Sequence, residues 1–176
     1  MAHNNTWANH RLLTACLHLS DEEFAVPRIG FFPSLRAMLN HMLVIDRFYV
    51  DAMEGGALGP AAWADPEPYH TVAALKAAQL EIDRRLIAVT EALGKDDLAR
   101  SIDVHQEDHI QRERMDRLLL HWFEHQIHHR GQAHCMLSGT SVAPPQLDEF
   151  FLEGEAHLRA AEISELGWTE EEIWGR

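Results

Sequence analysis

Residues 111–137 decide the fold, and they read Gln-Arg-Glu-Arg-Met-Asp-Arg-Leu-Leu-Leu-His-Trp-Phe-Glu-His-Gln-Ile-His-His-Arg-Gly-Gln-Ala-His-Cys-Met-Leu. Apolar residues recur here every third or fourth position, which predicts one long amphipathic helix. Ser138-Gly139-Thr140 and then Pro144-Pro145 follow, and both are typical of a helix end. A helix with one apolar face needs other elements to cover it, so this stretch predicts a helical domain.

The chain on either side of this stretch has the same helical periodicity, and no convincing strand pattern is found. The Gly- and Pro-rich segment 54–70 is long enough to serve as a crossover rather than a tight turn. Ser20-Asp21-Glu22-Glu23 is either a polar break or the start of a new helix, and residues 95–109 are polar and ambiguous. The expected architecture is all-α, a four-helix bundle with a long crossover connection. The predicted helices cover about 5–19, 33–53, 71–93, 111–137 and 146–165, with a short terminal helix from 169.

Composition excludes several classes of function. With 176 residues, one domain over 1–176 is enough. The chain carries 15 Lys and Arg against 28 Asp and Glu, a net charge of −13, so nucleic acid is not an expected partner. No leader or membrane-spanning run is found, which predicts a cytoplasmic protein with no membrane partner. Cys16 and Cys135 lie in helical patterns, where we expect buried, inert thiols and no disulfide.

Thirteen histidines are the unusual feature of the composition, and the helix over 111–137 holds five of them. At about 100° of rotation per residue, His125 and His129 fall in one sector with Leu118, Trp122, Gln132, Ala133 and Met136. His121 and His128 lie toward a flank of that sector, and His134 points away. Side chains four residues apart on a helix have Cβ atoms about 5–6 Å apart, so two imidazoles can hold one ion. His125 and His129 are therefore the preferred pair.

A third ligand must come from another helix, and His41 is the best donor. It lies mid-way along the predicted 33–53 helix, at the margin of an apolar face. Three histidines leave a coordination position open, which is the pattern of catalytic zinc sites, and imidazole also suits nickel or iron. Each histidine also has a plainer interpretation as an ordinary core or surface residue. His105 and His109 have the same spacing but lack an inward apolar stripe.

The segments Leu39-Asn40-His41-Met42-Leu43-Val44-Ile45-Asp46-Arg47 and His125-Gln126-Ile127-His128-His129-Arg130-Gly131-Gln132 resemble the two signature segments of the DinB family. Pro144-Pro145-Gln146-Leu147-Asp148 is similar to the stretch that follows the second signature. The likeness covers about residues 5–152, which leaves a C-terminal helical extension over about 153–176. The resemblance implies a four-helix bundle, a homodimer, and His41, His125 and His129 as the ligands of one divalent transition metal ion. Nickel or zinc is the ion implied first, with iron or manganese as alternatives.

Characterised DinB relatives include transferases that use low-molecular-weight thiols, together with hydrolase-like and isomerase proteins. The resemblance therefore implies a metal-dependent thiol S-transferase or hydrolase, with a small-molecule substrate and a low-molecular-weight thiol as partner. A non-catalytic metal-binding protein of the stress response is the alternative, and a helical interaction module without metal is a third. The sequence names no acid–base residue.

Three residues near the predicted ligands have open roles. Asp46 either orients a ligand imidazole or pairs with Arg47 or Arg130. Gln132 either contacts a bound water or packs between helices. Gly131, inside a long helix, predicts the close approach of a neighbouring helix.

Overall fold

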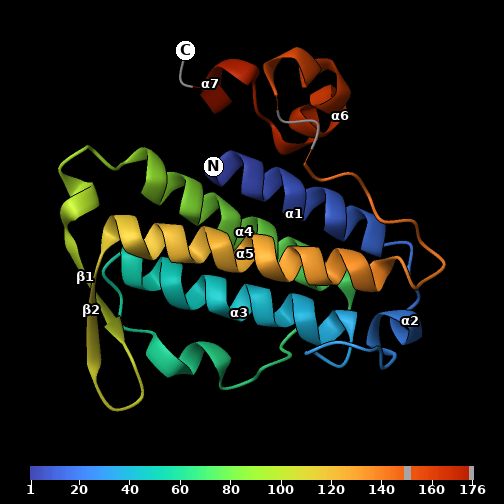
Figure 1. Ribbon diagram of the computed structural model, residues 1–176, viewed down its shortest axis with the longest axis horizontal. Helices are drawn as coiled ribbons and strands as arrows, with labels where there is room; N and C mark the ends of the chain where they lie inside the picture. Colours follow the sequence, from blue (N-terminus) through green and yellow to red (C-terminus); the bar gives the residue numbers. More distant parts are fainter. Residues whose placement is uncertain (149–151, 175–176) are drawn as a thin grey trace.

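The computed structural model describes residues 1–148 and 152–174, and it is mostly helical (Figure 1). Four long helices pack side by side, and each borders two of the others: α1 and α3 both contact α4 and α5. The main apolar core lies between these four helices. No helix in the described part of the chain is long and apolar enough to cross a membrane. The long helices are α1 (Ala2–Cys16), α3 (Leu35–Met53), α4 (Val72–Glu91) and α5 (Met115–Leu137).

The connection between α3 and α4 returns along the outside of α3, so these two helices run in the same direction (Figure 1). It contains a short 3-10 helix, η1 (Gly59–Trp63), which packs on α3. α1 and α5 run the opposite way. Contacts between side chains agree, since Asn9 meets Asp83 and Thr14 meets Lys76 across the α1–α4 pair.

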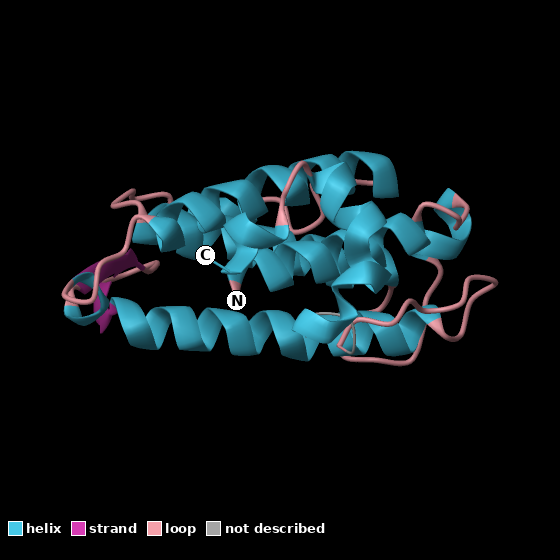
Figure 2. Cartoon of the chain, turned by 90° about the horizontal axis from the view of Figure 1, so that it is seen from above, coloured by secondary structure: helices cyan, strands magenta, loops and turns pink. Residues whose placement is uncertain are grey.

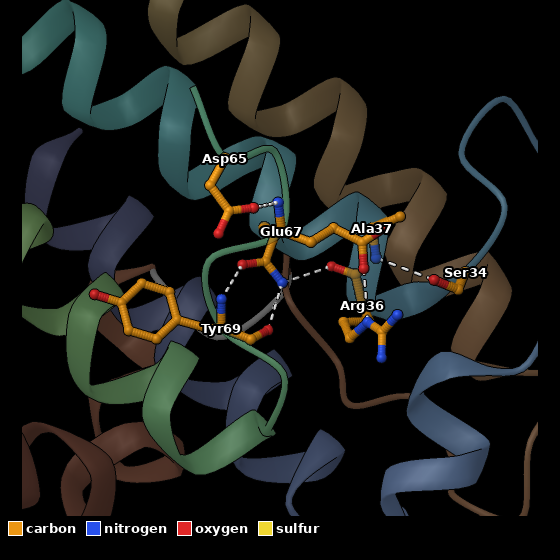
Figure 3. Close-up of polar contacts among 7 residues, drawn as sticks. Ser34, Arg36, Ala37, Asp65, Glu67 and Tyr69 are labelled. Carbon is orange, nitrogen blue, oxygen red and sulfur yellow. Dashed lines mark hydrogen bonds and ion pairs between the residues drawn. The ribbon is translucent and has the colours of Figure 1, made fainter. Parts of the chain in front are cut away.

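The end of this connection is tied to the N-terminal half of α3 (Figure 3). Asn40 is fully buried; its amide donates to the Tyr69 carbonyl at 2.7 Å and accepts from the Tyr69 N–H at 2.9 Å. Arg36 Nε and Glu67 Oε2 form an ion pair at 2.6 Å, and Arg47 donates to the Tyr69 hydroxyl. The residue that precedes His41 therefore fixes the return of the crossover.

Side-chain caps set the starts of three helices. Ser34 accepts from the Ala37 N–H at the start of α3, and Thr71 accepts from the Ala74 N–H at the start of α4. Ser20 and Glu23 form a capping box, and a short helix, α2 (Asp21–Ala25), follows. Of the two interpretations of residues 20–23, the new helix is correct.

An antiparallel hairpin replaces part of the predicted helical region, so the all-α expectation is wrong. After the short η2 (Asp97–Ala99), strand β1 (Ser101–His105) pairs with β2 (Ile110–Arg114), and Asp103 lies opposite Arg112. α5 begins at Met115 instead of residue 111. The apolar side chains Ile102 and Val104 alternate with polar ones and are buried, whereas β2 is polar throughout its last four residues. Figure 2 shows the hairpin at one end of the long helices.

The C-terminal region begins later than predicted. Residues 146–148 are not helical, residues 149–151 lie outside the described residues, and α6 (Ala156–Leu166) follows η4 (Glu153–Glu155). α7 (Glu170–Trp174) is the short terminal helix. α6 packs on α1, where Trp7 forms a second apolar cluster with Ile163 and Leu166.

A buried polar network joins the four long helices. Gln79 Nε2 donates to Asp46 Oδ2 at 2.7 Å and to Asp83 Oδ1 at 3.0 Å. Gln126 Nε2 also donates to Asp46, and Asn9 Nδ2 donates to both oxygens of Asp83. Arg130, on α5, donates to the amide oxygens of two α1 side chains at 2.7 and 2.8 Å, which are those of Asn5 and Asn9. Each helix thus supplies at least one buried polar partner.

Burial is the largest influence on the two acids of this network. It raises the pKa of Asp83 to about 6 and the pKa of Asp46 well above its ordinary value. The repulsion of Asp83 raises the pKa of Asp46 further, while nearby Arg130 opposes both shifts. The folded protein therefore holds a proton on Asp83 at a pH where the unfolded chain has released it.

Replacement of Asp83 with Asn should change how stability depends on pH. Because the pKa of Asp83 is raised to about 6 from its ordinary 3.8, its contribution to stability is complete below about pH 4 and is lost as pH rises to 6. The free energy of unfolding of the wild type, minus that of Asp83→Asn, should fall by about 2–3 kcal/mol over this window and stay constant above it. Urea unfolding between pH 4.5 and 7.5 measures this difference. Parallel curves for the two proteins would contradict the expected shift.

Candidate metal centre

The three histidines predicted as ligands lie together between α3 and α5. His41 comes from α3, and its Nε2 is 3.2 Å from His125 Nε2 on α5. His129 lies one turn further along α5, with its ring centroid 4.4 Å from that of His125 and 4.8 Å from that of His41. One ring nitrogen from each residue lies within 4.8 Å of the other two. Among the described residues, no fourth His, Cys, Asp or Glu joins this group.

The antiparallel packing of α3 on α5 explains this convergence. As residue numbers rise along α3 they fall along α5, so His41 meets His125 and His129 while Tyr49 meets His121. Residues four apart on α5 share a face, and both imidazoles there point to the same turn of α3. One ring from α3 and two from α5 thus reach a common point.

The donor set suits a divalent transition metal ion. Burial, together with repulsion from His129, lowers the pKa of His41 to about 4 and the pKa of His125 to about 3. Burial also lowers the pKa of His129. All three rings are therefore neutral at pH 7 and offer lone pairs. Two nitrogens on one tetrahedral zinc ion would lie about 3.3 Å apart, close to the distance between His41 and His125.

Gln132 holds the third imidazole from behind. Its Oε1 lies 2.8 Å from His129 Nδ1. Because an amide oxygen only accepts hydrogen bonds, this contact places the ring proton on Nδ1 and leaves the Nε2 lone pair free. Gln132 was predicted to contact a water or to pack between helices, and the structure instead gives it a ligand to orient.

Phe32 covers the histidines, and no sequence pattern singled it out. Its ring centroid lies 4.5 Å from that of His41 and 5.6 Å from that of His129. A cavity of about 360 Å³ beside it is lined by Phe32, His41 and Trp63 among others. The metal centre is therefore half-buried, with an aromatic cover on one side and open space next to it.

The other histidines on or near α5 stay outside the group. His121 and His128 are exposed on its flank, and His134 Nε2 instead contacts the Pro145 carbonyl at 2.9 Å. His105 and His109 lie at the tip of the hairpin, on β1 and in the turn after it.

Three expectations about neighbouring residues need correction. Asp46 accepts hydrogen bonds from the amides of Gln79 and Gln126, and among the described residues it forms no hydrogen bond to a candidate ligand imidazole and no ion pair with an Arg. A Cβ added at Gly131 would meet nothing within 4 Å, so no neighbouring helix in the described part of the chain approaches it closely. Cys135 is exposed rather than buried, although Cys16 is buried and both are free thiols.

Comparison with known proteins finds a matching family model and a similar fold. A model of the DinB family matches residues 1–165. The fold is similar to the crystal structure of a DinB-like protein from Bacillus cereus ATCC 10987, with a TM-score of 0.64 and 14% sequence identity over 82% of this chain and 91% of that chain. At this identity the likeness concerns the fold alone. No curated protein has significant sequence similarity to the chain.

Metal analysis should find about one divalent ion per chain, and His125→Ala should abolish stoichiometric binding. Loss of a direct ligand should weaken affinity by more than the roughly 10- to 100-fold that follows loss of an outer-shell partner. His128→Ala is the matched control, because His128 is exposed on the same helix and outside the group. Equal weakening in both variants would show that the ligands are misidentified.

Gln132→Ala should weaken metal affinity by roughly 10- to 100-fold, because His129 loses the acceptor that fixes its tautomer. Gln132→Glu keeps an oxygen acceptor and should retain affinity close to that of the wild type. Competition with a chromogenic chelator measures both. If Gln132→Glu binds as weakly as Gln132→Ala, the hydrogen bond does not orient the ring.

Proposed function

The chain belongs to the DinB family, and from this premise we propose that it binds one divalent transition metal ion through His41, His125 and His129. Nickel or zinc is the ion we propose first, with iron or manganese as alternatives. The proposal is supported by three neutral imidazoles that converge from two helices. On this proposal the four long helices form the family's four-helix bundle, and α6 and α7 form an extension to it. The protein is then a cytoplasmic homodimer.

We further propose that the site is catalytic. The observation that carries this is the small number of protein donors: three imidazoles and no fourth ligand among the described residues. When bound, a divalent ion at such a site supplies Lewis acidity that lowers the pKa of a thiol or a water. A structural site would be closed by a fourth protein ligand.

The reaction we propose is transfer of a small electrophile to a low-molecular-weight thiol. A carbon–sulfur bond forms, the bond from that carbon to its leaving group breaks with its electron pair, and the thiol proton passes to solvent. Gln132 keeps His129 in one tautomer during this step, and Phe32 limits the access of water from its side. Because the rings are half-buried, the charges that develop in this step interact more strongly with these neighbours than they would in open solvent.

Hydrolysis of a small ester or amide is the closest catalytic variant, since water can take the place of the thiol. A non-catalytic metal-binding role in a stress response is the remaining candidate. A test with and without thiol separates all three.

The metal-loaded protein should form thioethers from small electrophiles and low-molecular-weight thiols, with turnover proportional to bound metal. His41→Ala should reduce the rate at least 100-fold, because a ligand is lost, and His109→Ala should leave it unchanged, because His109 lies on the distant hairpin turn. Product formation is followed by mass spectrometry across a panel of thiols, electrophiles and esters. Stoichiometric metal without turnover of any of them would leave only the non-catalytic role.

A further inference from the structure

A larger cavity, of about 580 Å³, lies between the segment that joins α2 to α3 and the C-terminal half of α5. Its volume is in the range of sites for small organic ligands, about 300–1,000 Å³. Most of its lining is apolar and includes Ile29, Phe31, Met38, Cys135 and Met136.

This cavity adjoins the metal centre. Gln132 lines it and also accepts the hydrogen bond from His129. Met38 lines it and lies one turn before His41 on α3. A molecule in the cavity would therefore touch Gln132, which contacts the His129 imidazole.

Its apolar side chains are exposed to an unusual degree. Ile29 is fully exposed, and Phe31 is 85% exposed. Two large apolar side chains that flank a cavity and are not covered by the protein itself indicate an apolar occupant. Met38 and Met136 add flexible, polarizable walls that adapt to different shapes.

Arg28 adds a positive charge to this apolar lining. Its two terminal nitrogens donate to the carbonyls of Glu23 and Gly139, at 3.1 and 3.0 Å, and its Nε is buried without a hydrogen-bond partner. No carboxylate of the described residues forms an ion pair with it; Glu23 is near enough for Arg28 to help lower the pKa of its carboxyl, but that carboxylate accepts from the Ser20 N–H. A guanidinium with only neutral acceptors, in a chain of net charge −13, is a favourable place for an anion.

We propose that, if the proposed function holds, the electrophilic substrate is an amphiphilic anion, with its apolar body in this cavity and its anionic group at Arg28. The occupant is thus a small molecule with a chain or ring system and a carboxylate-like group. A second copy of the chain or another protein covering Ile29 and Phe31 is the competing occupant.

Calorimetry on the metal-loaded protein tests the proposal with 1-decanesulfonate, an anion that coordinates metals poorly, and with decyltrimethylammonium, a cation of the same chain length. The sulfonate should bind one to one and at least 10-fold more tightly than the ammonium, although the net charge of the protein favours the cation. Arg28→Gln should remove this preference. Arg28→Lys should keep it, which separates the effect of charge from the loss of the two loop hydrogen bonds.

Blocking the cavity is the second arm. Cys135→Trp fills it from α5 without touching the histidines and should weaken sulfonate binding at least 10-fold. Leu120→Trp is the control, because Leu120 is an exposed apolar residue on the same helix and outside the lining. The metal content of the same samples tests the proposed metal site independently of the binding of the sulfonate.

Equal binding of the two amphiphiles, or sulfonate binding that survives Cys135→Trp, would overturn the inference even where one metal ion is bound per chain. A dimer that Cys135→Trp dissociates, seen by sedimentation together with absent sulfonate binding, would also overturn it and identify the cavity as a protein interface.

Discussion

The rotation of α5 about its own axis is the constraint on which the metal centre depends. Gln126 directly follows His125, and Arg130 directly follows His129, so each polar pair spans about 100° of the helix. Gln126 donates to Asp46 on α3, and Arg130 donates to amides on α1. A rotation that took the imidazoles away from His41 would also break these buried hydrogen bonds, each at a cost of about 1–3 kcal/mol. The network thus fixes the direction of the ligands.

The same network accounts for the ionisable side chains that are buried between the four long helices. Asp46, Asp83 and Arg130 are all buried, and two acids face one base. Replacing such a group with apolar side chains often leaves stability unchanged or raises it, so its value is better sought in specificity than in stability. Here the specific outcome is one register between α1, α3, α4 and α5, since partners come from all four. Asn40 acts similarly at the crossover, next to His41.

The angular position of each residue on α5 explains which parts of the candidate site could be predicted from the sequence. The pairing of His125 with His129 follows from helical spacing alone, and the starts of α3 and α4 from their capping residues. The buried sector, however, is centred nearer Trp122, Gln126 and Ala133, about 80° from His125. Its centre was misplaced because Gln126 and Arg130 are polar and are buried only through tertiary hydrogen bonds. The misplaced centre also led to the prediction that Cys135 is buried, whereas it is exposed. The hairpin was missed because β2 has no apolar alternation, and its form depends on pairing with β1.

Neither histidine of α5 lies at the centre of the buried sector, since His125 is about 80° from it and His129 about 40°. An imidazole at the sector's centre would be enclosed by the core, with no room for a ligand from solvent. His41, His125 and His129 are instead half-buried, and a cavity lies against His41. Burial there is sufficient to keep the rings neutral, as the lowered pKa values of His41 and His125 indicate, and incomplete enough to leave access. Phe32 covers His41 and His129 on a side that the core does not, and the exposed Phe31 lies against Phe32.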